Sequence, residues 1–405
     1  PSKAILDGVV LELNEIIDDH APNLRAYLDA HPEVDRMVRT DEGSYYAYPF
    51  IRGHEDLLVS SGIIVRHDWL NELGLDIPET MDEWHTALTA FKDEKGATAP
   101  LTFELYMLGW GHWTNAFGVL NGFYRDDDGN VKYGAMEEGY REFLETFAQW
   151  YEEGLIDPDL ATVDSTQTNA KMTSGQSGVS LGWMASRMGV WTTAAREQNP
   201  DYLLAGAPVP VGEAGGPKRF GSYEFPYARS GSAAITTSNE NVEAAARFLD
   251  YPYSNEGHIL FNFGIEGESF NWEDGYPRYA DPMYNDPEGR PLATMLAQYI
   301  RGNYNGPFVQ DKRYIEQYVP LPEQQVAYQT WVDTDAANHL MPPVTATPDE
   351  SRELAEIMNE ITDYRDEMFL SYLFGNESLD SFDEYVERIE SMNIARAIEI
   401  QEAAL

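Results

Sequence analysis

The run IIVRHDWLNELG at residues 63–74 decides the fold class of this chain. Its β-branched beginning is typical of a buried strand, and its second half places Trp69, Leu70 and Leu73 at helical spacing. Gly74 follows directly, and glycine at that place is typical of a helix end. The run therefore predicts a strand that leads into a helix.

The same succession continues along the chain. Residues 45–51 have the composition of a strand, and Thr80-Met81-Asp82-Glu83 has the pattern of a capping box that begins a helix extending to about Gly96. Further strands are expected at residues 178–183, 202–209 and 233–236, and further helices at residues 137–153, 347–375, 382–392 and 394–404. This alternation predicts an α/β fold.

Two stretches depart from the regular pattern. Residues 271–322 show little periodicity beyond a short helix at residues 292–300, which predicts a large irregular excursion. Residues 126–130, Asp-Asp-Asp-Gly-Asn, predict a turn between two short strands. Oxygen-bearing side chains here also match ligand positions of an EF-hand, but Val131 stands where that loop needs glycine, so calcium is the less favoured interpretation.

Length and charge limit the classes of function. A chain of 405 residues with 43% hydrophobic content is too long for one ordinary core and is expected to form two lobes. Acidic residues outnumber basic ones 69 to 27, and the resulting field repels phosphates and anionic lipid headgroups. We therefore expect no nucleic acid partner, and the acidity is typical of a solvated surface.

The chain contains no cysteine, which excludes disulfides, thiolate nucleophiles and cysteine-based zinc sites. It has no apolar run of about 18 residues, the length that crosses a membrane. Pro1-Ser2-Lys3 is not followed by the apolar core of a signal peptide. Any export signal or lipid-anchor cysteine is therefore expected upstream of this chain.

The sequence shows no catalytic constellation. It lacks the nucleophile elbow, the zinc-protease motif, the phosphate-binding loop and the dinucleotide fingerprint. His112 lies between Trp110 and Trp113, but a lone histidine is more often a packing residue than a ligand contact. Among 69 acidic residues, some pair suited to a glycosidase will always be found. We expect no enzyme, no cofactor and no metal.

Aromatic residues make up 13% of the chain, and many lie in non-helical segments beside amides and charges. Sugar rings have apolar C–H faces and polar edges, so a sugar site combines flat aromatic rings with side chains that bond hydroxyl groups. For any single tryptophan, core packing is an equally good explanation. Their gathering in loops and at strand ends favours a sugar site.

Motifs in a specific order give the chain a resemblance to the family-1 extracellular solute-binding proteins of bacterial carbohydrate transporters. It resembles most the larger lipoprotein-type members of Gram-positive bacteria. The motifs are Tyr46-Ala47-Tyr48-Pro49, the stretch 69–75 running into 78–84, Gly154-Leu155-Ile156-Asp157-Pro158-Asp159, the stretch 174–178 and the stretch 263–270.

The resemblance implies two α/β lobes joined by hinge crossovers, with the ligand in the cleft between them. It implies lobe one at residues 1–102 and 232–342, and lobe two at residues 103–231 and 343–405. Family members begin with a strand, a helix and a strand before the counterpart of Ile5, which this chain lacks. Lobe-one contacts from that part are expected to be missing.

The resemblance also implies ligand-binding residues. Trp183 matches a tryptophan that stacks on sugar in the maltose-binding relatives, and an aromatic residue after the first crossover, Trp110 or Trp113, is expected to act similarly. The other candidates, placed by their proximity to cleft-forming loops, are Tyr223, Glu224, Arg187, Asn115, Arg52, Glu268 and Trp272.

The expected function is extracellular binding of a sugar, preferably an oligosaccharide, and its delivery to the permease subunits of an ABC transporter. The protein is expected to be monomeric and anchored by lipid to the outer face of the cytoplasmic membrane of a Gram-positive bacterium. Two alternatives remain open. They are a carbohydrate-active hydrolase, and a solute-binding protein for a peptide or polyamine.

Overall fold

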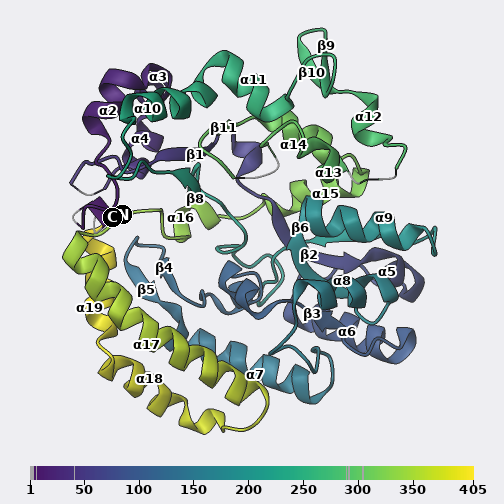
Figure 1. Ribbon diagram of the computed structural model, residues 1–405. Coiled ribbons are helices and arrows are strands. Elements are labelled where there is room, and N and C mark those ends of the chain that lie inside the picture. Colours follow the sequence, from purple (N-terminus) through teal and green to yellow (C-terminus); the bar gives the residue numbers. More distant parts are fainter. Residues whose placement is uncertain (1–3, 6, 41, 289, 291, 303–304) are drawn as a thin grey trace.

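The computed structural model describes residues 1–405 except 1–3, 6, 41, 289, 291 and 303–304. Pro1-Ser2-Lys3, the start that the sequence predicts to lack a signal peptide, thus lies outside the described residues. The two largest β-sheets of the protein lie in different parts of the molecule, and each has its own helices (Figure 1). The protein is therefore two-lobed and α/β, as expected.

The first sheet has the strand order β11-β1-β8. Its central strand β1 (Tyr48–Arg52) pairs antiparallel with β8 (Tyr227–Ala233) and parallel with β11 (Val309–Gln310). A hydrophobic core joins this sheet to nearby helices. These helices are α2 (Asn14–His20), α3 (Pro22–Ala30), α4 (Pro32–Val38) and α10 (Val242–Asp250). We call this part the β1 lobe.

The second sheet has the strand order β3-β6-β2-β7. Strand β2 (Ser61–Arg66) runs antiparallel to both β6 (Val179–Trp183) and β7 (Leu204–Ala207), and β3 (Leu101–Thr102) runs parallel to β6. Side chains of β2 alternate between two cores, with Ile63 and Val65 in the larger one and Ile64 in the other. The strand is buried along its whole length because both faces of the sheet are covered. We call this part the β2 lobe.

Local signals set the helices next to β2. Helix α5 (His67–Leu73) ends at Gly74, which has the left-handed φ of 69° that glycine tolerates. Helix α6 (Met81–Lys95) begins with the reciprocal capping box of Thr80 and Glu83. Both predictions are confirmed.

Some of the remaining helices of the β2 lobe lie beside its sheet, and others extend the lobe toward the C-terminus (Figure 1). Helix α17 begins after Thr347, close to the start predicted at residue 347, and the Thr347 hydroxyl caps it by accepting from the Glu350 N–H. The helices are α7 (Glu138–Glu152), α8 (Ser165–Ser174), α9 (Val190–Arg196), α15 (Pro322–Trp331), α16 (Ala336–His339), α17 (Pro348–Leu373), α18 (Phe382–Ser391) and α19 (Ile394–Ala403).

The predicted turn at residues 126–130 is confirmed. It joins β4 (Phe123–Arg125) to β5 (Val131–Tyr133). The Asp126 carboxylate accepts hydrogen bonds from the backbone N–H groups of Asp128 and Asn130 at 3.0 and 2.8 Å. This carboxylate therefore stabilises the turn itself.

Two other expectations need correction. The strand expected at residues 233–236 lies earlier in the chain, as β8. The small and polar residues of β8 have low β-propensity of their own, and the hydrogen-bond ladder with β1 holds them in a strand.

The excursion at residues 271–322 is more regular than predicted, because packing around Phe263 and Phe270 orders it. It contains β9 (Phe270–Glu273), β10 (Tyr276–Tyr279), α12 (Asp281–Tyr284), α13 (Leu292–Leu296) and α14 (Lys312–Tyr318), and it follows α11 (Asn255–Phe263).

The predicted division into lobes also differs from the sheet pairing. It placed residues 61–66 in lobe one and residues 179–183 in lobe two, but β2 and β6 are neighbours in one sheet. The chain leaves the first sheet after Arg52 and enters the second at Ser61, well before residue 102. Hydrogen bonding between strands distant in sequence, which no local pattern reveals, decides this boundary.

Within the described residues, no helix combines the length and the apolar composition needed to cross a membrane.

Candidate functional site

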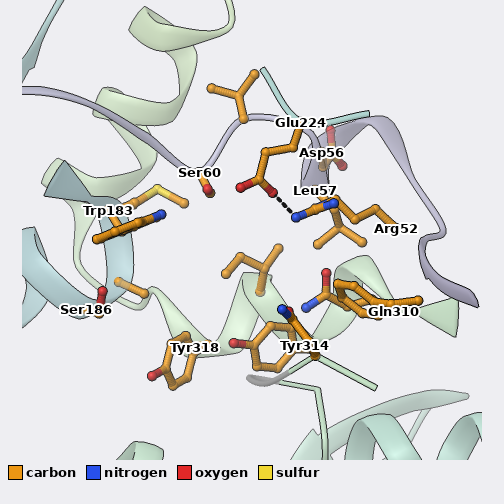
Figure 2. A pocket seen from close by; sticks show the side chains of 16 residues that line it. Arg52, Asp56, Leu57, Ser60, Trp183, Ser186, Glu224, Gln310, Tyr314 and Tyr318 are labelled. Atoms are coloured by element: carbon orange, nitrogen blue, oxygen red, sulfur yellow. Dashed lines mark ion pairs between the residues drawn. The ribbon is translucent and has the colours of Figure 1, made fainter. Parts of the chain in front are cut away.

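A cavity of about 280 Å³ opens between the two lobes. Phe50 and Arg52 at the end of β1 line it from one side, and Trp183 at the end of β6 lines it from the other. Residues of the connecting segment 53–60 complete it. Figure 2 shows Arg52, Leu57 and Trp183 around a common space. Strand ends of two separate sheets therefore form this site.

A second cavity of about 200 Å³ adjoins the first. Trp183 and Glu224 line both cavities, and Trp110 and Tyr223 line the second. Because the two cavities share walls, we treat them as one interlobe site.

Aromatic rings form much of the surface of this site. The rings of Trp110 and Trp183 meet edge to face, with centroids 5.1 Å apart. Tyr106, which is 60% exposed, continues this row beyond Trp110 at a centroid distance of 6.2 Å. On α14, Tyr314 and Tyr318 stack at 5.2 Å and line the first cavity. Flat apolar surfaces therefore face the site from both lobes.

The polar part of the site is an ion pair between Arg52 and Glu224. Figure 2 shows it across the cavity from Tyr314 and Tyr318. Burial raises the pKa of Glu224, and the Arg52 charge opposes that rise. Burial likewise lowers the pKa of Arg52, against the attraction of Glu224. The pair is thus partly desolvated, and its remaining donor and acceptor positions can bond hydroxyl groups.

Hydrogen bonds fix the segments that connect the lobes beside this pair. The backbone N–H of Glu224 donates to the Leu58 carbonyl at 2.7 Å, and the hydroxyls of Ser61 and Ser222 lie 2.6 Å apart. Asp56 accepts from Lys312 at 3.4 Å and from the Tyr328 hydroxyl at 3.2 Å. The site therefore sits where the chain crosses between lobes.

The structure brings half of the expected ligand-binding residues to this site. They come from β1, from the segment before β8, from β6 and from the 3₁₀ helix η2 (Leu105–Trp110). These residues are Trp183, Trp110, Tyr223, Glu224 and Arg52.

Trp113 does not line either cavity, because it is buried in the core of the β2 lobe against Trp84, Phe147 and Trp150. Of the two candidates after the first crossover, Trp110 is the one at the site. The two side chains point differently because η2 ends at Trp110 and Gly111 then turns the chain with a φ of 78°.

Asn115 is a structural residue away from the cavities. Its side-chain amide donates to the carbonyls of Pro210 and Pro217, and its oxygen accepts from the N–H groups of Arg219 and Phe220. It therefore holds the loop 210–220 in place.

Arg187 is buried directly behind the site. Its Nη2 donates to Glu104 Oε2 at 2.6 Å, its Nη1 donates to Asn169, and its guanidinium lies 5.7 Å from the centre of the Trp191 ring. With its charge balanced inside the core, Arg187 is not presented to a ligand in the cavities.

Glu268 and Trp272 lie away from the two cavities. Glu268 is exposed in the loop before β9, and Trp272 is 42% exposed on the β9–β10 hairpin, where it packs against Phe270. The expectation that proximity to cleft-forming loops brings these two residues to the cavities is therefore not met.

Sequence reasoning missed Tyr314, Tyr318, Gln310 and Asp56, which line the first cavity. Tyr314 and Tyr318 are four residues apart, the spacing of one helix face, inside the stretch that was expected to be irregular. This spacing is the sequence signal that could have placed both tyrosines on one face of a helix.

Among the described residues, no cluster of three or more histidine, cysteine, aspartate or glutamate side chains has the arrangement of a metal site. His112 is buried, and desolvation lowers its pKa to about 3, so its ring is neutral. It packs edge to face against Trp110 at 6.0 Å and so supports one wall of the site.

A two-lobed α/β fold with an aromatic cavity between its sheets is the architecture of a solute-binding protein. The chain belongs to the family of bacterial extracellular solute-binding proteins, whose model matches residues 3–259. This is a family of binding proteins.

Curated relatives agree with this assignment. The lipoprotein LipO of Bacillus subtilis is 29% identical over 291 residues, which is 67% of this chain and 55% of LipO. FusA of Streptococcus pneumoniae, a fructooligosaccharide ABC transporter substrate-binding protein, is 27% identical over 281 residues, 64% of this chain and 50% of FusA. The chain thus spans about half the length of these relatives.

Among solved structures, the alginate-binding protein AlgQ2 without calcium ion matches with a TM-score of 0.82 and 25% identity. The match covers 100% of this chain and 83% of AlgQ2. The shared two-lobed fold therefore extends over the whole of the present chain.

Proposed function

We propose that this protein binds a sugar, preferably an oligosaccharide, in its interlobe site and delivers it to an ABC transporter. The observation that carries the proposal is the meeting of Trp110, Trp183 and Tyr223 with the Arg52–Glu224 pair in one site. Aromatic rings cover the C–H faces of a sugar, and the charged pair bonds its hydroxyl groups. The names of FusA and AlgQ2 both refer to saccharide ligands, which supports this class of ligand.

Each ligand-binding residue has a proposed role. Trp183 and Trp110 stack on sugar rings from the β2 lobe, and Arg52 and Glu224 bond hydroxyl groups where the chain crosses between the lobes. Tyr223 adds an aromatic wall between them. Three or more aromatic rings in one cleft favour a sugar over a peptide or polyamine.

We propose that the lobes close over the ligand. The β1 lobe would consist of about residues 4–52 and 226–318, and the β2 lobe of about residues 61–225 and 319–405, joined by three crossings. Residues of both lobes line the site, so bound sugar favours the closed arrangement. The permease subunits of the transporter would recognise that arrangement.

We further propose that the protein works as a monomer outside the cell, anchored by lipid to the membrane of a Gram-positive bacterium. The extracellular character of the family and the lipoprotein relative LipO support this location.

Calorimetric titration of the protein against plant and host oligosaccharides, with product analysis afterwards, tests the proposal. The expected result is binding at micromolar or lower concentration with the sugar left intact. Trp183→Ala is expected to weaken that binding about 30-fold or more, because it removes a central aromatic contact.

Trp272→Ala is the matched control, since it makes the same change on an exposed hairpin outside the cavities. Its affinity should equal that of the unaltered protein. If no sugar in the panel binds, or if both variants lose affinity equally, the interlobe site is not the sugar site.

A further inference from the structure

The charges around the interlobe site distinguish between two kinds of saccharide. We propose that the ligand is an uncharged sugar chain and that the site rejects oligosaccharides of uronic acids. This inference rests on the proposed sugar-binding function and specifies its substrate class. It follows from the sign and the pairing of the charged groups that face the cavities.

Carboxylates outnumber cations on the described walls of the site. The charged side chains that line the first cavity are Arg52, Asp56 and Glu224, and Glu224 is the charged residue that lines the second. Arg52 is already paired with Glu224. A uronate placed against the aromatic rings would therefore find no unpaired cation among these side chains.

Three cations close to the site are likewise paired with carboxylates. Lys312 lies 3.4 Å from the Asp56 carboxylate, and Arg187 is buried against Glu104 at 2.6 Å. Arg313, next to Lys312 on α14, forms an ion pair with Asp311 at 2.6 Å. Each of these side chains would have to leave a carboxylate partner to bind an acidic sugar, which costs the existing pair.

The remaining polar groups suit a neutral ligand. Ser60, Ser186 and Gln310 line the first cavity, and Ser61 and Ser222 line the second. Hydroxyl and amide groups both donate and accept hydrogen bonds, as sugar hydroxyls do. The long-range field agrees, because a formal net charge of −42 repels an anion approaching from solvent.

The test compares trisaccharides of equal length by calorimetric titration of the protein at low and at high salt. One set consists of neutral gluco-, galacto-, manno- and fructo-oligosaccharides, and the other of galacturonate and mannuronate trimers. A neutral trimer is expected to bind with an affinity that changes less than about twofold with salt, because no net charge is transferred. Uronate trimers are expected to bind about 100-fold more weakly or not at all.

A uronate trimer that binds as tightly as the best neutral trimer would overturn this inference and leave the sugar-binding function intact. If no trimer of either set binds, the proposed sugar-binding function itself fails. The two failures are therefore distinguishable.

A charge variant gives a second, independent measurement. Glu224→Gln keeps the shape of the side chain but frees Arg52 for another carboxylate, so uronate affinity should rise about tenfold or more while neutral affinity does not rise. Glu268→Gln makes the same change of net charge at an exposed position outside the cavities and should leave both affinities unchanged. Equal behaviour of the two variants would contradict the role assigned to Glu224.

Discussion

The indole rings of Trp110 and Trp183 lie edge to face, with 71° between their planes, although they belong to η2 and β6, two elements distant in sequence. Each ring therefore limits the orientation of the other. The half-buried pair presents one continuous aromatic surface to the second cavity.

Trp110→Leu should weaken sugar binding about tenfold, because it removes one aromatic surface and releases the ring of Trp183. Calorimetric titration measures the affinity, and urea denaturation measures the free energy of unfolding. The free energy of unfolding should change less than the free energy of sugar binding, because the Trp110 side chain is only partly buried. An unchanged affinity would show that Trp183 does not depend on this neighbour.

Asn115→Ala should lower the free energy of unfolding by about 2–4 kcal/mol, because it leaves buried backbone groups of the loop 210–220 without partners. Urea denaturation followed by tryptophan fluorescence measures the change. Asn285→Ala, which removes an exposed local bond to Asp281, is the matched control and should cost less than about 0.5 kcal/mol. A cost for Asn115→Ala as small as that of the control would contradict the structural role of its amide.

Arg187→Met should lower the free energy of unfolding by about 3–5 kcal/mol, because it leaves Glu104 charged and unpaired in the core. The double variant with Glu104→Met should be considerably more stable than the single one, since it removes the buried charge as well. Thermal and urea denaturation of both variants check this. Equal stability of single and double variants would contradict the ion-pair explanation.

Asp311 predicts a pH dependence of stability. Burial alone would raise its pKa, but hydrogen bonds from His258 and Arg313 hold that pKa well below its usual range. The Asp311 carboxylate therefore takes up a proton at about pH 3.9 in the unfolded chain and only at a lower pH in the folded protein. Its stabilising contribution is fully present above about pH 5 and is lost as the pH falls toward the folded-state pKa.

Asp311→Asn should consequently lower the free energy of unfolding by about 2 kcal/mol at pH 7, and the difference should shrink as the pH falls below about 4. Urea denaturation at a series of pH values measures this. A difference that is the same at pH 7 and pH 3 would show that the ionised carboxylate is not the stabilising form.

Local sequence predicted much of the fold correctly. The glycine after Leu73, the capping residue Thr80, the start of the helix near residue 347 and the turn at residues 126–130 each lie where the sequence places them. These features are governed by backbone conformation and by hydrogen bonds over a few residues. Such short-range physics is visible in the sequence without the fold.

The site was only half predictable. Trp183 could be placed because it matches a sugar-stacking tryptophan of the maltose-binding relatives, and it lies at the end of β6. Trp110 and Trp113 could not be separated, since both are tryptophans in one irregular segment, and a single left-handed glycine between them decides which ring is buried. Tyr314 and Tyr318 belong to the site only because α14 folds back between the lobes.

By itself, then, the sequence determined the α/β class, the ends of several helices, the acidity and the resemblance to solute-binding proteins. Only the tertiary structure decided where the lobes divide, since β2 joins β6 and β7 through hydrogen bonds between distant segments. It also decided which charges face the cavity, as Arg52 with Glu224 do, and which are buried in the core, as Arg187 with Glu104 are. The physical reason is that burial and charge pairing depend on neighbours in space, which residues adjacent in sequence do not specify.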